Sequence, residues 1–177
     1  MSSKERLTFE KLSNKKFISI LKESIDQYEC EVDENIFADK CFFIAHSKFD
    51  QIFMIKYNNR NEEFLNGFSK IDLSPYSIGV PVLKWHRNKF FPTISMGNIL
   101  AKICKNKITL DESKVEKLTY GKPVLIDRKI EFRDGIAVDK NGDFISYVTL
   151  LNKKNGIKIV TEVIPTLDVG WYLREGG

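Results

Sequence analysis

YGKPVLIDRKIEFRDGIAVDKNGDFISYVTLLNKKNGIKIVTEV, residues 120–163, is the most informative stretch of the chain. Polar turns carrying Gly or Asp separate four short runs rich in β-branched or aromatic residues: Val124–Ile126, Ile136–Val138, Phe144–Leu151 and Ile157–Val163. The turn Asp139–Asp143 contains Asn141-Gly142, a pair that accepts the positive φ values of a tight hairpin. Strands this short and this regularly separated predict a small β-barrel or sandwich rather than a parallel sheet.

The residues after these strands change their periodicity. Leu167, Trp171 and Leu173 are spaced to lie on one side of a short helix. We expect this helix to close the open end of the barrel. Arg174 then has a structural role, because its guanidinium can satisfy carbonyl groups at a helix terminus.

Several of these residues carry a family resemblance. Leu118-x-Tyr120-Gly121, the spacing to Gly135-Ile-Ala-Val138, and the closing Asp168-Val-Gly-Trp-Tyr-Leu-Arg174 resemble the PUA domain, an RNA-binding module. More narrowly, they resemble the PUA half of the Nip-seven-like family, which assists assembly of the large ribosomal subunit. The resemblance runs from about residue 78 to 150 and through the tail.

Composition narrows the class of protein. The 177 residues are 42% hydrophobic and 29% charged, as in ordinary globular proteins, and the net charge of +4 is spread evenly over the two halves. No apolar run approaches the roughly 20 residues of a membrane span, and we expect no signal peptide. Cys30, Cys41 and Cys104 are widely spaced, so we expect buried free thiols in a reducing compartment. With only two histidines and no Cys-x-x-Cys, we expect no metal and no cofactor.

The first part of the chain alternates helical and strand patterns. Its predicted helices are Asn14–Cys30, with Ser13 as N-cap, Asn61–Ile71 and Met96–Cys104, and its predicted strands are Cys41–Ala45, Ile52–Tyr57, Tyr76–Arg87 and Phe90–Ile94. This order predicts an α+β fold with a mainly antiparallel sheet.

The polar residues after Cys104 mark the predicted domain boundary. We therefore expect an N-terminal α/β sandwich-like domain over residues 1–104 and, from the resemblance, a PUA β pseudo-barrel over residues 105–177. Asp111 is expected to cap a short helix, Glu112–Thr119. The short linker without Gly predicts that the two domains pack in a fixed orientation.

Catalytic patterns are missing from the sequence. Neither a Gly-rich phosphate loop nor a nucleophile–base pair around His46 or His86 occurs. PUA modules accompany RNA-modifying enzymes, but residues 1–104 are short for a catalytic domain. We therefore predict no catalytic residues. An RNA-modifying enzyme or its accessory subunit stays open as an alternative.

Two basic clusters are candidate RNA contacts. The first is Lys84-Trp-His-Arg87-Asn-Lys-Phe-Phe, where cations alternate with aromatic side chains that can stack on bases. Burial of those aromatic side chains in the core is the competing interpretation. The candidate contacts in this cluster are Lys84 and Arg87.

The second cluster is Asn152-Lys-Lys-Asn-Gly-Ile-Lys158, interpreted as a turn that projects Lys153, Lys154 and Lys158 into solvent. A solvated hairpin tip without a function is the competing interpretation. The resemblance implies that this side of a PUA barrel carries basic RNA-contacting residues.

Together these observations predict a non-enzymatic RNA-binding factor. The resemblance implies a role in large-subunit assembly and pre-rRNA maturation, with an rRNA precursor and ribosome-assembly proteins as partners. We expect a monomer without membrane contact, located in the cytoplasm, or in the nucleolus if the source is eukaryotic. A protein-interaction scaffold remains a further alternative.

Overall fold

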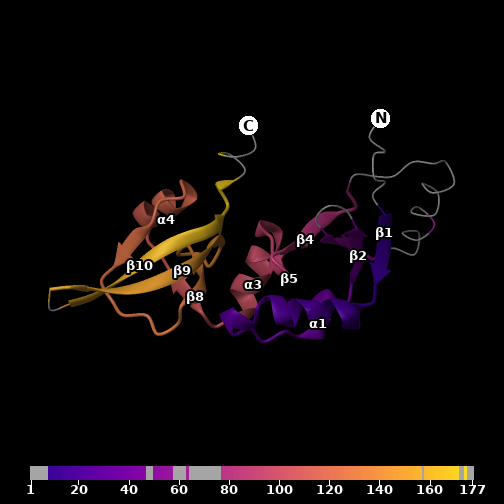
Figure 1. Cartoon of the computed structure of the whole chain (residues 1–177), viewed down its shortest axis with the longest axis horizontal. Coiled ribbons are helices and arrows are strands. Elements are labelled where there is room, and N and C mark those ends of the chain that lie inside the picture. Colours follow the sequence, from indigo (N-terminus) through magenta and orange to yellow (C-terminus); the bar gives the residue numbers. More distant parts are fainter. Residues whose placement is uncertain are drawn as a thin grey trace. The chain divides into compact units, whose positions relative to one another are not determined.

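The computed structural model describes residues 8–46, 50–57, 63, 77–156, 158–171 and 174. The chain forms two units, one from residues 1–24 and 32–95 and the other from residues 25–31 and 96–177. Each unit is built on one five-stranded sheet accompanied by helices (Figure 1). The predicted α+β fold class is confirmed.

The first sheet is an antiparallel meander whose strands follow the order of the sequence. It consists of β1 (Thr8–Leu12), β2 (Lys40–His46), β3 (Gln51–Lys56), β4 (Val80–His86) and β5 (Lys89–Pro92). The predicted hairpin and the two later strands are therefore present with small shifts at their ends. The predicted helix Asn61–Ile71 lies outside the described residues, except for Glu63.

Helix α1 (Asn14–Ser24) packs against β2 and β5 of this sheet. Ser13 caps it as predicted, because its hydroxyl oxygen accepts from the Lys16 amide at 3.2 Å. The apolar face of α1 and the 3-10 helix Glu34–Phe37 meet the sheet through three rings. Phe17 stacks on Phe42 with centroids 3.5 Å apart, and Phe37 approaches both rings edge-on at 5.3 and 5.9 Å. This aromatic cluster is the centre of the first core.

The second sheet is assembled out of sequence order. Its strands lie in the order β6 (Lys107–Thr109), β8 (Asp134–Val138), β9 (Phe144–Asn155), β10 (Lys158–Asp168) and β7 (Val124–Ile126). Among the described strands of this sheet, β6 and β8 form the one parallel pair. Helix α4 (Glu112–Thr119) begins at Asp111, whose carboxylate accepts from the Lys114 amide at 3.0 Å, as predicted. The turn Asp139–Asp143 is also present, with the carboxylate of Asp139 accepting from two backbone amides and Gly142 at φ 87°.

The second unit begins earlier than the predicted boundary after residue 104. Helix α3 (Gly97–Ile103) packs against β8 and β9, and the Phe144 amide donates to the Asn98 side chain at 2.9 Å. A Cβ at Gly97 would lie 2.3 Å from the Phe144 ring, so helix and strand are in direct contact here. The polar linker after Cys104 therefore lies inside the second unit.

The predicted helix Asn14–Cys30 is too long, and residues 25–31 belong to the second unit. The helix ends at Ser24, and a 3-10 turn, Asp26–Tyr28, follows it. Here the backbone bonds to residues after α3 instead of continuing the helix. The Lys105 amide donates to Glu29 at 3.0 Å, and Asn106 donates from its backbone to Tyr28 and from its side chain to Gln27. Tertiary hydrogen bonds thus replace helical ones.

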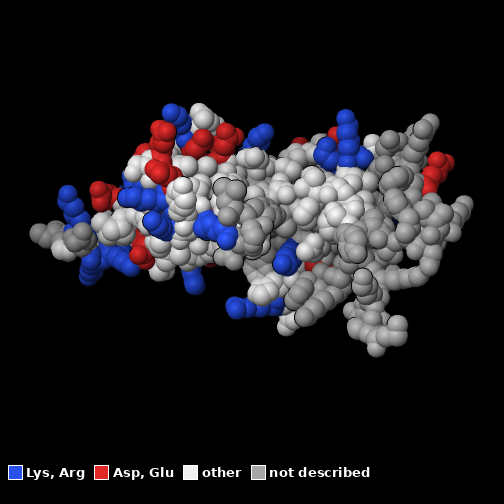
Figure 2. Space-filling view, turned by 90° about the horizontal axis from the view of Figure 1, so that it is seen from above, with Lys and Arg blue, Asp and Glu red and all other residues white. Residues whose placement is uncertain are grey.

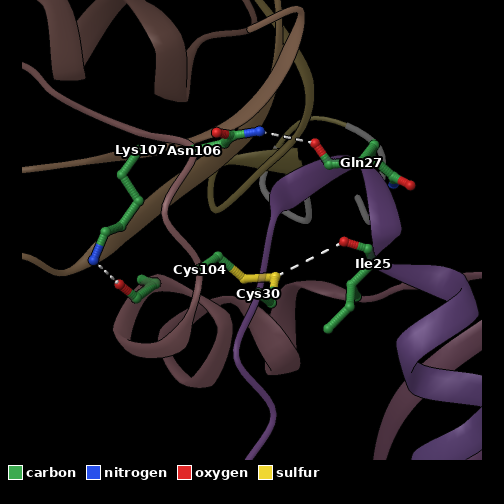
Figure 3. The surroundings of a disulfide bond; sticks show 7 residues. Ile25, Gln27, Cys30, Cys104, Asn106 and Lys107 are labelled. Carbon is green, nitrogen blue, oxygen red and sulfur yellow. Dashed lines mark hydrogen bonds between the residues drawn. A yellow bond between two sulfur atoms is a disulfide. The ribbon is translucent and has the colours of Figure 1, made fainter.

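A disulfide joins Cys30 to Cys104 in the same region (Figure 3). The expectation of free thiols is therefore wrong for these two residues, and of the three cysteines Cys41 alone is a buried free thiol. The two cysteines are 74 residues apart in sequence, and an antiparallel β-bridge brings their backbones together. Sequence spacing alone carried no sign of this long-range contact.

The end of the chain also differs from the prediction. Leu167 belongs to β10, where it pairs with Tyr147 across a bulge, so it is not on the face of a closing helix. The extended strand continues because backbone pairing with β9 lasts until Asp168. Leu173 lies outside the described residues. Among the described parts of the chain, no helix is long and apolar enough to cross a membrane.

Candidate nucleic-acid interface

Strands β9 and β10 continue past the rest of the second sheet as a two-stranded ribbon (Figure 1). β8 pairs with β9 only as far as Thr149, and β7 pairs with β10 only from Thr161 onward. The β9–β10 pairing extends further, to Asn155 opposite Lys158, and Gly156 follows in the turn at φ 63°. The ribbon, residues 152–156 and 158–160, therefore projects beyond the strands that flank β9 and β10 in the sheet.

The predicted basic turn is mostly strand. Lys153 and Lys154 lie within β9 opposite Val160 and Ile159, and Lys158 begins β10. The interpretation of residues 152–158 as a turn is therefore wrong, because the hydrogen-bonded ladder persists to Asn155. All three lysines are exposed nonetheless.

Strand alternation divides these lysines between the two faces of the ribbon. Lys153 and Lys158 share one face as diagonal neighbours across the strands, a relation that places Cβ atoms roughly 7–8 Å apart. Lys154 is on the opposite face, beside Ile159. The ribbon thus presents positive charge on both faces instead of one footprint of three lysines.

One of the three lysines already has an anionic partner. Lys153 Nζ lies 2.7 Å from Glu162 Oε2 on the same face of the ribbon. The pair is partly exposed, so it contributes little to stability and can exchange for another anion at small cost. Lys153 therefore reaches a phosphate only by releasing Glu162.

A hydrogen-bond network fastens a second basic segment to the base of the ribbon. The Asn152 side chain donates to the Ile130 carbonyl at 2.8 Å and accepts from the Ile130 amide at 3.2 Å. The Thr161 hydroxyl lies 2.6 Å from the Arg128 carbonyl and 2.6 Å from Asn152. This holds the loop carrying the exposed residues Arg128 and Lys129 beside β9 and β10.

Arg128 and Lys129 were not among the predicted contacts. The Asp-Arg-Lys run after Ile126 was a visible signal, but only the tertiary structure places it at the ribbon. In Figure 2, Lys and Arg side chains gather at the end of the second unit where the ribbon projects. The candidate interface is therefore wider than the cluster predicted from sequence.

The other predicted contacts, Lys84 and Arg87, lie in the first unit on the β4–β5 hairpin. His86 pairs with Lys89, so Arg87 and Asn88 form a two-residue turn with φ values of 47° and 67°. Lys84 is exposed on β4 opposite Phe91. The competing interpretation, aromatic burial, holds in part. Phe90 and Phe91 are half-buried, but Trp85 remains 37% exposed.

The closing motif has the structural role expected of Arg174. Its guanidinium binds both carboxylate oxygens of Asp168, at 3.1 and 2.7 Å, and donates to the Thr119 carbonyl at the end of α4. Asp168 is 3% exposed and also accepts from the Gly170 amide at 2.9 Å. This network fastens the end of β10 to α4.

Within the described residues, no group of three or more His, Cys, Asp or Glu is placed to hold a metal ion. The shifted pKa values there have structural causes. The pKa of Glu31 lies below its usual value because Lys105 binds its carboxylate, and burial raises the pKa of Tyr147 well above its usual value. These two groups lie in the second unit, and neither belongs to the basic ribbon.

No protein-family model and no curated protein matches this chain. One similar solved structure is that of a conserved PUA domain protein from Thermoplasma acidophilum, with a TM-score of 0.47 and 13% sequence identity, covering 80% of this chain and 79% of that chain.

Proposed function

We propose that this protein is a non-enzymatic RNA-binding protein that contacts the phosphate backbone through the β9–β10 ribbon. The main observation in support is that the ribbon projects beyond its sheet, with Lys153 and Lys158 on one face and Lys154 on the other. Cations on a projecting element approach phosphates without disturbing the core, and phosphate contacts supply most of the affinity for RNA. Arg128 and Lys129 extend this surface at its base.

The cellular role in this proposal is assembly of the large ribosomal subunit and maturation of pre-rRNA. It is supported by the resemblance of the Leu118–Gly121 and Asp168–Arg174 motifs to the Nip-seven-like family. We further propose that the protein acts as a monomer in the cytoplasm, or in the nucleolus of a eukaryote, on an rRNA precursor together with assembly proteins. Crosslinking in cells tests this role, because the recovered RNA must then be predominantly precursor rRNA.

Binding to a fluorescent single-stranded RNA over a range of salt concentrations tests the RNA contact. In single strands, each neutralised phosphate contributes about 0.7 to the slope of log affinity against log salt. Replacing Lys153, Lys154 and Lys158 by Ala should therefore flatten the slope by about 2 and weaken binding to many sequences alike. Replacing Lys15, Lys16 and Lys22, exposed on α1, is the matched control with the same loss of charge. Equal effects of both triple variants would overturn the assignment.

The two faces of the ribbon can be tested separately. If RNA follows one face, Lys153→Ala with Lys158→Ala should flatten the slope by about 1.4, while Lys154→Ala should change it little. If RNA contacts both faces, the double variant and Lys154→Ala should affect the slope in proportion to the lysines removed. No change in either variant would exclude the ribbon as the phosphate contact.

A further inference from the structure

The β4–β5 hairpin of the first unit covers a small hollow beside α1. Its volume is about 200 Å³, and its lining combines aromatic, polar and charged side chains: Ile20, Glu23, Ser24, Trp85, Asn88, Lys89 and Phe90. This is smaller than the pockets of several hundred Å³ that enclose drug-sized ligands. The size therefore suits one planar group of a larger molecule.

The aromatic side of the hollow is built for stacking. Trp85 and Phe90 are cross-strand partners whose rings meet edge-on with centroids 4.9 Å apart. The contact holds the indole in place, yet Trp85 remains 37% exposed. An oriented and accessible indole is a platform for a nucleobase, since every base has a π-face and stacking tolerates any sequence.

The lining of the hollow also supplies hydrogen-bond acceptors. Glu23 is the charged residue that α1 contributes to the lining, and its carboxylate has two acceptor oxygens and no donor when ionised. Guanine places two N–H donors side by side on its Watson–Crick edge, whereas uracil places one N–H between two acceptors. A carboxylate that lines the same hollow as a stacking platform therefore favours guanine.

The turn of the hairpin adds a second, independent observation. Arg87 has φ 47°, in the left-handed region that a residue with a side chain rarely adopts, whereas the following Asn88 is well suited to it. Two-residue hairpins of this type prefer Asn-Gly or Asp-Gly. Arg87 directly precedes Asn88, a residue that lines the hollow, and its exposed side chain brings a cation to this turn.

We propose that the hollow under the β4–β5 hairpin binds a single unstacked guanine of RNA. Trp85, held edge-on by Phe90, stacks against the base, Glu23 accepts from its Watson–Crick edge, and Arg87 contacts the adjoining phosphate. This rests on the proposed function in that the partner is RNA. It adds a base-reading contact in the first unit to the phosphate contacts of the ribbon.

Titration with guanosine monophosphate, followed by NMR of the tryptophan indole N–H groups, tests the hollow directly. Trp85→Phe identifies the Trp85 signal, which should shift with guanosine monophosphate and respond at least tenfold more weakly to uridine monophosphate. Glu23→Gln should reduce this preference, and Glu34→Gln, an exposed acid in the same unit, should leave it unchanged. No shift of Trp85 with either nucleotide, or equal affinity for both, would overturn the proposal.

Arg87→Gly separates binding from folding, because its two effects have opposite signs. Glycine relieves the strained φ, so the melting temperature should rise, while loss of the cation should weaken binding of guanosine monophosphate. A binding role and a purely structural role are thereby distinguished. A variant that melts higher and binds equally well would overturn the role of Arg87.

Failure of this inference and failure of the proposed function give different results. In the triple Lys153, Lys154 and Lys158 variant, RNA affinity should fall while the Trp85 shift with guanosine monophosphate is retained. If the triple lysine variant loses RNA affinity and the Trp85 signal does not shift with guanosine monophosphate, the guanine site is wrong and the ribbon proposal stands. If Trp85 responds and no RNA binds, the hollow binds free nucleotides and the proposed function is wrong. A Trp85 response to an unrelated peptide in place of guanosine monophosphate would overturn the nucleobase assignment.

Discussion

The two units are held together in different ways. The first is a meander in which every strand pairs with its sequence neighbour, and its core centres on Phe17, Phe37 and Phe42. The second brings together segments that are far apart in sequence, and it uses the Cys30–Cys104 disulfide and the Asp168–Arg174 pair as fasteners. Closing the long loop between the two cysteines costs entropy, which contacts such as those of the disulfide region offset.

The units are alike in where they carry charge. The basic residues of the β9–β10 ribbon and of the β4–β5 hairpin lie on hairpins outside the apolar cores. Their substitution should therefore change binding with small effects on folding. Core substitutions should do the reverse, and they should act on one unit at a time.

Phe17→Ala should have the largest effect. It removes the ring stacked on Phe42 and leaves a cavity, so we expect a loss of about 4 kcal/mol in the free energy of unfolding. Hydrogen exchange with mass spectrometry should show the lost protection in α1 and β2, with β9 and β10 much less affected. An equal loss of protection in both units would show that the two units unfold together, contrary to the expectation that core substitutions act on one unit at a time.

Removing the disulfide should come next. Replacing Cys30 and Cys104 by Ser opens a loop with a sequence separation of 74 residues, which should cost about 3 kcal/mol. Exchange should increase in residues 25–31 and α3, while the first unit keeps its protection. Reduction of the unsubstituted protein should have the same effect. Finding three free thiols in the purified protein under non-reducing conditions would contradict the assignment.

Loss of the closing ion pair should have a moderate effect. Arg174→Ala leaves the buried Asp168 carboxylate without its cation and the Thr119 carbonyl without its donor, so we expect a loss of about 2 kcal/mol. Denaturant unfolding should show that adding Asp168→Ala to Arg174→Ala costs less than Asp168→Ala costs alone. Strict additivity of the two substitutions would show that the residues do not act together.

The smallest effect on stability is expected at the ribbon. Glu162→Gln frees Lys153 from its ion pair and should change the free energy of unfolding by less than about 1 kcal/mol. RNA affinity should increase, because Lys153 no longer has to release a carboxylate before it binds a phosphate. The slope of log affinity against log salt, measured by fluorescence anisotropy, should become steeper. Glu112→Gln on α4 is the control for the change in net charge, and an equal gain there would exclude a specific effect of Lys153.

The candidate site was predictable in part. A run of lysines near Gly156 indicated an exposed basic element, because charged side chains remain in solvent whichever strand carries them. Which face each lysine occupies depends on where the ladder ends, and residues 152–155 are equally compatible with a strand or a turn. The contributions of Arg128 and Glu162 depend on pairing with residues far away in sequence.

By itself the sequence determined the features that depend on near neighbours. The strand runs after residue 120, the turn at Asp139, the caps at Ser13 and Asp111 and the helix after Met96 all follow from periodicity and local hydrogen bonding. Only the tertiary structure decided which cysteines pair and to which unit residues 25–31 belong. It also decided that an arginine turns the β4–β5 hairpin at a positive φ. Those outcomes are set by contacts between distant segments, whose energies outweigh local preferences and leave no periodic trace in the chain.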